Sequence, residues 1–359
     1  MTAPINTPHA YVIMVAERFT TGVVLAVPDG RGYGGRMLKT SLAVAALLLM
    51  PAPSLAWGAL GHRTIATIAY SESRPATRRA IKALLKHGKE LDTPTCSLKT
   101  IEDAAVWPDC IKGLGKRFSA MSPWHYQDIS VCHDFDYAEG CPDGKCVTRQ
   151  IALQSARLRD LTLPARDRVE ALALLVHFVG DMHQPLHIGE KGDQGGNGVR
   201  ATFLGTTGKW MNLHSIWDTS LPEVAVPLKP RLGKHSVTPL ERAEWRAAGD
   251  GPEAVEAWAR ESWALSRDTV YGKLADYPDR CLVPPAPAPE PGTLTAEQAA
   301  AAAAIAEVAA ANTGPVAQIG LSYTDAAVPL VRERIEAAGV RLGMLLDDVL
   351  AVPVTDVAR

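Results

Sequence analysis

The chain has 359 residues, of which 47% are hydrophobic, so it is long and apolar enough to bury one large core or two smaller ones. This composition excludes wholesale disorder. The 37 basic and 39 acidic residues nearly balance, so the overall charge does not signal a nucleic-acid partner, although bound cations could supply a positive field locally.

The first two segments are predicted to be absent from the mature protein. Residues 37–56 combine a positively charged start, an apolar stretch and small residues up to Ala56. This pattern is typical of a secretory signal peptide and is too short to span a membrane; an uncleaved membrane anchor is the alternative. Residues 1–36 resemble no structural unit, and we interpret them as a leader from a mis-assigned start. Cleavage after Ala56 would make Trp57 the first residue.

The hydrophobic pattern that follows is mainly helical. Apolar residues recur at helix spacing in seven stretches, which are residues 64–87 (with a break near Pro75), 100–109, 148–163, 165–182, 253–274, 294–311 and 325–350. Residues 199–204 and 209–213 flank a glycine-containing turn and predict the one β-hairpin. We therefore expect one mainly α-helical domain at 57–359, with a small hairpin and a Pro/Ala-rich insertion at about 284–311.

The six cysteines all lie after the predicted cleavage site, and they are Cys96, Cys110, Cys132, Cys141, Cys146 and Cys281. An even number fits full pairing in an oxidising compartment, although many pairings are possible. Cys141 and Cys146 flank a Pro-Asp-Gly turn, which favours that pair. A zinc site built on cysteines is the alternative, but no two cysteines have the spacing that such sites usually show.

Two His–Asp pairs at helical spacing organise the chain. His177 and Asp181 are four residues apart in an apolar run, His187 follows shortly after, and His214 and Asp218 are again four apart. Four residues is about one helical turn, so the two side chains of each pair point the same way. Imidazole and carboxylate suit zinc. One such histidine is usually a satisfied core residue, but two pairs and a third histidine favour a metal site.

The segments around these residues resemble the zinc-dependent single-strand nucleases and 3′-nucleotidases, the S1- and P1-type nucleases, whose fold is similar to that of bacterial zinc-dependent phospholipase C. The matching segments are WGALGH at 57–62, AAVWPD at 104–109, WHYQD at 124–128, LLVHFVGDMHQPLH at 174–187, GGN at 195–197 and NLHSIWD at 212–218. The segment AGVRLGMLL at 338–346 resembles the closing helix of the family, whereas residues 225–320 match poorly.

The resemblance implies three zinc ions and nine metal ligands. Asp109, His125 and His177 would hold the first ion, His187, His214 and Asp218 the second, and His62 with the free amine and carbonyl of Trp57 the third, while Asp181 would bridge the first and third. An α-amine binds metal only when it is free and unprotonated. We therefore expect the unprocessed chain to lack the complete third site.

The activity that the resemblance implies is hydrolysis of single-stranded RNA and DNA to 5′-nucleotides, with 3′-nucleotidase activity, by a hydroxide that bridges two zinc ions. Asp109 and Asp181 would orient the nucleophile, and Lys112 would neutralise a phosphate oxygen. Tyr126 would stack on a base, which requires that the base be unpaired. Asp128 would hydrogen-bond the base edge and Asn197 would shape the pocket. Each of these four also has an ordinary alternative, as a surface lysine, core tyrosine, surface acid or turn residue.

The bridges of the family would fall on Cys132 with Cys281 and on Cys141 with Cys146, which leaves Cys96 with Cys110. His183 lies between predicted ligands, and we expect it to orient them or to face outwards. We expect a secreted or periplasmic monomer with no stable protein partner and no membrane contact after cleavage. Two alternatives remain: a phospholipase C that uses the same metal site, and a non-catalytic zinc-scavenging or adhesion protein.

Overall fold

The computed structural model describes residues 57–206, 211–226, 252–274 and 316–350, with the isolated positions 239 and 243. The predicted leader, the signal peptide, the helix at 294–311 and the insertion at 284–311 lie outside the described residues. Among the helices that are described, none is both long enough and apolar enough to cross a membrane.

The first predicted helix is two helices, α2 (Ala59–Glu72) and α3 (Pro75–Leu85), with the expected break before Pro75. The Ser73 hydroxyl donates to the Ala69 carbonyl at 2.7 Å and ends α2. Pro75 then occupies the first turn of α3, where its missing N–H costs nothing. α2 begins five residues before the predicted start, so it carries His62 in its first turn.

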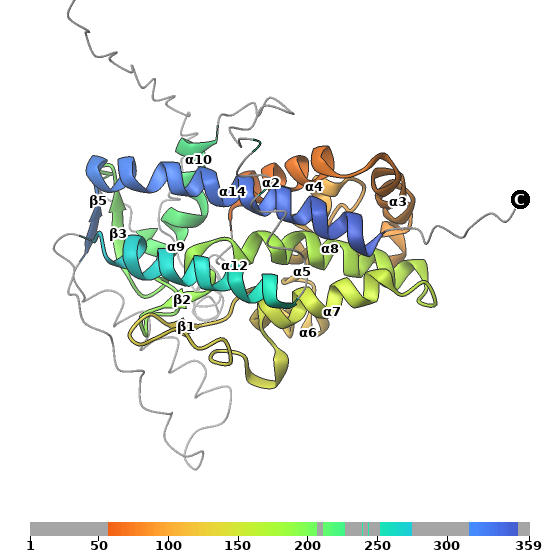
Figure 1. Cartoon of the computed structure of the whole chain (residues 1–359), viewed down its shortest axis with the longest axis horizontal. Helices are drawn as coiled ribbons and strands as arrows, with labels where there is room; N and C mark the ends of the chain where they lie inside the picture. Colours follow the sequence, from red (N-terminus) through yellow and green to blue (C-terminus); the bar gives the residue numbers. More distant parts are fainter. Residues whose placement is uncertain are drawn as a thin grey trace, which may run out of the picture. The chain divides into compact units, whose positions relative to one another are not determined.

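Helix α8 (Ala165–Met182) lies at the centre of the described fold. Every residue from Val169 to Met182 is buried, which explains its nearly continuous apolar sequence. It contacts α2, α3, α7 (Val147–Arg159), α14 (Leu321–Val349) and α12 (Pro252–Leu265), as Figure 1 lets the reader follow. A helix buried on all sides can hold polar side chains such as His177 and Asp181 rigidly inside the protein.

Helix α14 is a single helix that begins four residues before the predicted start at 325. It packs along α2, and two glycines allow the close approach. A Cβ atom at Gly339 would lie 2.6 Å from the Ile68 Cβ, and one at Gly343 would lie 2.9 Å from the Ala69 carbonyl oxygen. The closing helix therefore fixes the position of α2.

The predicted hairpin is present, with β3 (Arg200–Phe203) antiparallel to β4 (Met211–Asn212). The expectation of one hairpin was nevertheless incomplete, because β5 (Ala317–Ile319) adds a parallel strand to β3, and β1 (Ile129–Ser130) pairs in parallel with β2 (Gly189–Glu190). Strands of two or three residues are too short to show alternation, and their partners are distant in sequence. The fold is mainly α, as predicted.

The remaining elements are short, and their bounds are as follows: η1 (Gly88–Leu91), α4 (Ile101–Ala104), α5 (Trp107–Ile111), α6 (Lys116–Ser119), η2 (Ser122–His125), η3 (Pro142–Gly144), η4 (Pro185–His187), α9 (Leu213–Ser215), the π-helical η5 (Ile216–Ser220), α10 (Leu221–Ala225) and the π-helical η6 (Ser266–Tyr271). The predicted helix at 100–109 is thus split into α4 and α5, and the one at 253–274 is α12 followed by η6. Several of these short elements carry candidate site residues, which the long helices hold in place.

Two predicted disulfides are confirmed. Cys96 pairs with Cys110 and Cys141 with Cys146, with Cα atoms 5.7 and 5.0 Å apart. Cys132 is also disulfide-bonded, and its predicted partner Cys281 lies outside the described residues.

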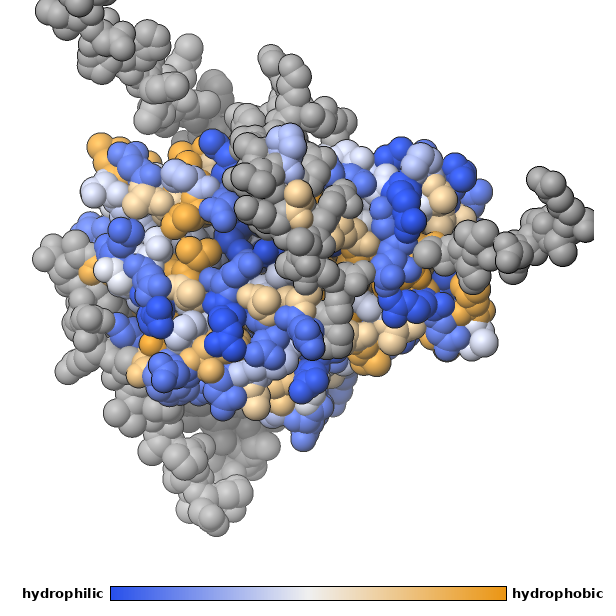
Figure 2. Space-filling model, viewed as in Figure 1, coloured by the Kyte–Doolittle hydropathy of each residue, from blue (hydrophilic) through white to orange (hydrophobic). Residues whose placement is uncertain are grey.

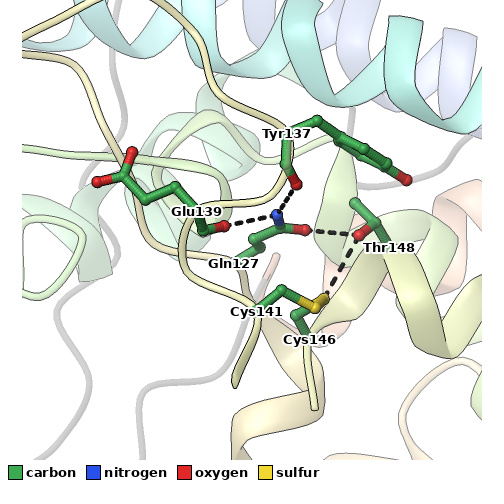
Figure 3. Close-up of a disulfide and its surroundings, with 6 residues drawn as sticks. All are labelled: Gln127, Tyr137, Glu139, Cys141, Cys146 and Thr148. Atoms are coloured by element: carbon green, nitrogen blue, oxygen red, sulfur yellow. Dashed lines mark hydrogen bonds between the residues drawn. A yellow bond between two sulfur atoms is a disulfide. The ribbon is translucent and has the colours of Figure 1, made fainter. Parts of the chain in front are cut away.

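The Cys141–Cys146 bridge lies beside the buried side chain of Gln127 (Figure 3). The Gln127 amide donates to the carbonyls of Tyr137 at 2.8 Å and Glu139 at 2.7 Å, and its oxygen accepts a hydrogen bond from the Thr148 hydroxyl at 2.5 Å. These bonds tie the cysteine-rich loop to the segment that carries His125 and Tyr126.

Candidate metal centre

The eight side chains predicted as metal ligands come from seven elements and converge in three groups. These groups are His62, His177 and Asp181; Asp109, His125 and His177; and His187, His214 and Asp218. Within each group, the potential ligand atoms all lie within 4.8 Å of one another. At this spacing, the side chains of each group could bind one metal ion together.

Asp109, His125 and His177 lie together as the resemblance implies. The Oδ1 atom of Asp109 is 3.8 Å from the Nδ1 atom of His125 and 3.7 Å from the Nε2 atom of His177. Asp109 stands in the first turn of α5, where Pro108 helps to start the helix. His125 ends η2, and His177 lies inside α8.

Asp181 stands between the first two groups with one oxygen toward each. Its Oδ2 atom lies 2.9 Å from the Nδ1 atom of His125 and 3.2 Å from the Nε2 atom of His177. Its Oδ1 atom lies 3.2 Å from the Nε2 atom of His62. A carboxylate in this position can serve two ions at once, which is the arrangement expected of a bridging ligand.

The third group lies where α9 continues into η5. The Nε2 atom of His214 is 3.1 Å from Asp218 Oδ2, and that of His187 is 3.9 Å from Asp218 Oδ1. Gln184 donates its amide to Asp218 Oδ1 at 2.6 Å and is completely buried. Gln184 was missed in the sequence, because a glutamine next to proline gives no sign of a partner 34 residues away.

Three histidines are oriented by backbone carbonyls. The Nδ1 atoms donate at 2.6–2.8 Å in the pairs His177 to Ala105, His187 to His125 and His214 to Gly195. This bond leaves a lone pair on each Nε2 atom, and that atom faces the other members of its group. The contacts join segments distant in sequence, so no local pattern reveals them.

Several buried polar atoms in these groups have no hydrogen-bond partner. They are His62 Nε2, Asp181 Oδ1, His187 Nε2, His214 Nε2 and Asp218 Oδ2, while Asp109 Oδ1 has only its ion pair with Lys112. A buried polar atom without a partner is costly, and native proteins rarely keep several in one place. Metal ions would satisfy all of them, and the nitrogen and oxygen donors fit zinc. The residues present therefore fit the metal.

Three of these side chains are held in the ionisation state that binds metal, whereas the pKa values of His177 and His214 are raised, because the nearby carboxylates outweigh the effect of burial. Burial lowers the pKa of His62, and burial together with the charge of Lys112 lowers the pKa of His125 to about 4. Burial alone would raise the pKa of Asp181, but the charge of His177 and the hydrogen bonds of nearby histidines hold it well below its usual value. The neutral imidazole and the ionised carboxylate are the forms that bind metal.

A cavity of about 510 Å³ opens beside these groups. Its lining residues are Lys112, Ser122, His125, Tyr126, Asp128, Leu186, His187, Gln194, Asn197 and His214. The four residues predicted to act on phosphate or base therefore share one cavity with three candidate ligands. Ser122, Leu186 and Gln194 were not predicted, since nothing in their local sequence distinguishes them from ordinary turn and loop residues.

The positions of the four predicted residues argue against most of their ordinary alternatives. Lys112 is not a free surface lysine, because its Nζ atom lies 2.7 Å from Asp109 Oδ1. Tyr126 is 38% exposed and so is not a core residue. Asp128 is half-buried, and burial, followed by the charge of Glu190, raises its pKa to about 7. Asn197 has a turn role, because its amide donates to the Gln194 carbonyl at 2.9 Å.

His183 faces away from the metal groups. It is fully buried, its Nδ1 atom donates to the Val179 carbonyl at 2.7 Å, and its Nε2 atom accepts a hydrogen bond from Arg341 at 3.0 Å. Both ring nitrogens are therefore occupied. His183 faces α14 rather than solvent, so the part of the expectation that had it facing outwards was wrong.

Comparison with known proteins agrees with the geometry. The S1/P1 nuclease family model matches residues 57–284. Endonuclease 4 of Arabidopsis thaliana is 28% identical over 309 residues, which are 83% of this chain and 90% of the relative. Nuclease P1 of Penicillium citrinum is 31% identical over 52% of this chain and 63% of its own length, and nuclease S1 of Aspergillus oryzae is 34% identical over 53% and 62%. With this match across more than half of its length, the chain belongs to the S1/P1 nuclease family.

Proposed function

We propose that the protein is a zinc-dependent phosphodiesterase that hydrolyses single-stranded RNA and DNA to 5′-nucleotides and removes phosphate from 3′-nucleotides. The observation that carries this proposal is the set of unpartnered ligand atoms in three His/Asp groups beside the cavity that holds Lys112 and Tyr126. Membership of the S1/P1 family supports it, as do the names of the relatives, which are nucleases and endonucleases.

Three zinc ions would occupy the groups, one for each. Zinc in such a site supplies Lewis-acid stabilisation of phosphate oxygens and lowers the pKa of nearby water. Asp109 and Asp181 would hold the ions and orient the attacking water, because each carboxylate has an oxygen among the potential ligand atoms of a group. The remaining roles fall on residues of the cavity.

Lys112 would bind a non-bridging phosphate oxygen. Its ammonium lies 2.7 Å from Asp109, so it stands at the edge of the metal groups rather than in bulk solvent. A positive charge fixed at this place stabilises negative charge that grows on the phosphate during hydrolysis.

Tyr126 and Asp128 would receive the base. The exposed ring of Tyr126 offers a stacking face, and stacking needs a base that is free of its partner strand. Asp128 lines the same cavity and could accept hydrogen bonds from a base edge when ionised, or donate one when protonated. This pair of residues accounts for a preference for single strands.

We also propose export and cleavage before Trp57. The two described disulfides fit an oxidising compartment. Trp57 is fully buried, and the backbone N–H of Gly58 donates to the carbonyl of Asp218 at 2.6 Å. These contacts hold the new N-terminus close to residues of the metal groups, where its amine could act as a ligand.

The test uses zinc-loaded protein that begins at Trp57, assayed on 3′-AMP, single-stranded DNA, duplex DNA and phosphatidylcholine. The proposal predicts turnover of 3′-AMP and of the single strand, and little of the duplex. Preferential turnover of phosphatidylcholine would favour the phospholipase alternative, and zinc binding without turnover of any substrate would favour the scavenging protein. A second form with extra residues before Trp57 should bind less zinc.

A further inference from the structure

A second cavity, of about 520 Å³, lies outside the metal centre, where α3, η1 and the chain before α4 meet. Four of its lining residues are lysines: Lys82, Lys86, Lys89 and Lys99. We call this cavity the lysine pocket. In the view of Figure 2, strongly hydrophilic residues also cover the surface over α3. The four lysines come from three separate segments, so no local pattern in the sequence indicates the pocket.

The lysine pocket carries a surplus of positive charge. All four lysines are exposed, and among the described residues none of them forms an ion pair, whereas Asp92 is the one acidic residue in the lining. Lysines that line one cavity repel one another, and an anion in the pocket would relieve that repulsion. The lining contains no aromatic residue, so it offers nothing on which a base could stack.

The walls of the lysine pocket are held in place. A Cβ atom at Gly88 would lie 2.3 Å from the carbonyl oxygen of Leu98, so the segment with Lys86 and Lys89 packs directly against the segment with Lys99. The groups that would receive an anion are therefore brought together by backbone packing, not by chance approach of long side chains.

The lysine pocket and the metal centre share helix α5. Cys96 lines the pocket and is bonded to Cys110, which directly follows Asp109. The Trp107 indole N–H, from the start of the same helix, donates to the hydroxyl of Thr93 in the pocket wall at 3.0 Å. Helix α5 thus joins the wall of the lysine pocket, through Cys110 and Trp107, to the His/Asp groups, through Asp109.

We propose that the lysine pocket binds backbone phosphates of a nucleic-acid strand whose scissile phosphate lies at the metal centre. Lysine ammonium groups bind phosphate as point charges without reading the base, so the site would be independent of sequence. It would favour longer strands over dinucleotides. This inference rests on the proposed nuclease function, and it names an additional contact for the same substrate.

The test compares the double variant Lys86→Ala/Lys99→Ala with the control Lys145→Ala/Lys273→Ala, which removes the same charge from exposed positions outside the pocket lining. Exposed lysines of this kind contribute little to folding, so both variants should fold. For a strand of about a dozen nucleotides, the pocket variant should raise KM about three- to tenfold, and for a dinucleotide it should leave KM unchanged. The logarithmic salt dependence of binding should fall by about 0.7 for each phosphate that the variant no longer binds.

Equal changes in the pocket and control variants, or an equal rise in KM for the dinucleotide, would overturn the inference. A separate arm measures binding of a fluorescent, hydrolysis-resistant phosphorothioate strand to the zinc-loaded proteins. If the parent protein hydrolyses no nucleic acid, weaker binding by the pocket variant alone still supports the phosphate site, whereas equal binding refutes it.

Discussion

The carboxylate of Asp181 contacts histidines of two neighbouring His/Asp groups. Its two oxygens face His62 on one side and His125 with His177 on the other, at 2.9–3.2 Å. It is completely buried, so its charge has no water to stabilise it, and only the surrounding histidines and a metal can do so. Both groups therefore depend on this residue.

Replacement of Asp181 by asparagine should remove that shared support with little change in volume. We expect the zinc content of the purified protein to fall. Replacing a residue that only orients a metal ligand typically lowers activity by about 10–100-fold. For Asp181→Asn we expect a larger decrease in kcat/KM. Metal analysis and a 3′-AMP assay check this. Asp160→Asn, at an exposed position, is the control; equal zinc and activity in both variants would show that Asp181 holds no metal.

Tyr126 allows a test of base stacking. Loss of one base stack costs about 1–3 kcal/mol, so Tyr126→Ala should lower kcat/KM on single-stranded DNA by roughly five- to 150-fold. Tyr126→Phe keeps the ring and should retain most of the activity. If the phenylalanine variant loses as much as the alanine variant, the hydroxyl rather than the ring face is what matters.

At the scale of elements, the metal centre depends on the close approach of α2 and α8. A Cβ atom at Gly180 would lie only 2.7 Å from the Nδ1 atom of His62, and the rings of His62 and His177 stack at 4.1 Å. His62 thus packs directly on the surface of α8, between residues that contribute to two groups. Glycine at 180 makes this possible.

Gly180→Ala should therefore push His62 away from Asp181 while α8 itself stays helical, since alanine favours helix. We expect the loss of about one zinc ion per chain and a strong loss of activity. Gly113→Ala, where an added Cβ atom meets nothing within 4 Å, is the matched control. Metal counts measured on both decide the matter, and an unchanged count in Gly180→Ala would contradict this account of the α2–α8 contact.

Helices α12 and α14 meet through two buried arginines, Arg334 and Arg341, and the partly exposed Glu261. Glu261 on α12 accepts hydrogen bonds from Arg334 at 2.6 Å and from Arg341 at 2.7 and 2.8 Å. Arg334 also donates to the carbonyl of His183, and Arg341 donates to its ring. The closing helix is thereby linked to the chain between Asp181 and His187.

This network predicts a pH-dependent stability. Burial alone would raise the pKa of Glu261, but its bonds to Arg341 and Arg334 hold that pKa below the usual value. A lowered pKa means that the stabilisation is fully present above the ordinary glutamate pKa of about 4.3 and is lost as pH falls through the folded value. Glu261→Gln should reduce the free energy of unfolding at neutral pH by about 1–2 kcal/mol, less than for a fully buried pair, because water screens the Glu261 side chain, which is 42% exposed.

Urea unfolding at several pH values checks this prediction. The difference between Glu261→Gln and the parent protein should be largest near neutrality and shrink in acid. Glu256→Gln on the same helix is the control, because its partner Arg260 is mostly exposed and such pairs contribute little. A difference that grows as pH falls would contradict the assigned direction.

At the scale of the whole molecule, the long helices and the convergence of the eight candidate ligands could be predicted from the sequence, but the contacts that support them could not. Helix α7 shows clear periodicity, α8 has a long apolar run, and the two His–Asp pairs are each spaced one turn apart. The paired strands β1 and β2 and the carbonyls that orient the histidines depend on contacts between distant segments. The same holds for the buried Arg334 and Arg341, whose partner Glu261 is more than 70 residues away.

The sequence also could not show which residues complete the cavity. Gln184 and Gln194 are the same residue type, and neither stands out in its local sequence. Gln184 is nevertheless buried against Asp218, whereas Gln194 is exposed in the wall of the cavity. Their roles follow from the fold around them. The resemblance to the family pointed to the candidate ligands, and the tertiary structure shows how these side chains are oriented.

The most direct test of the account is a crystal structure of the mature protein with anomalous diffraction data collected on both sides of the zinc absorption edge. We predict three zinc peaks, one within each His/Asp group, with Asp181 between two of them and the amine of Trp57 on one. Peaks elsewhere, or none at these eight side chains in protein grown with zinc, would contradict it.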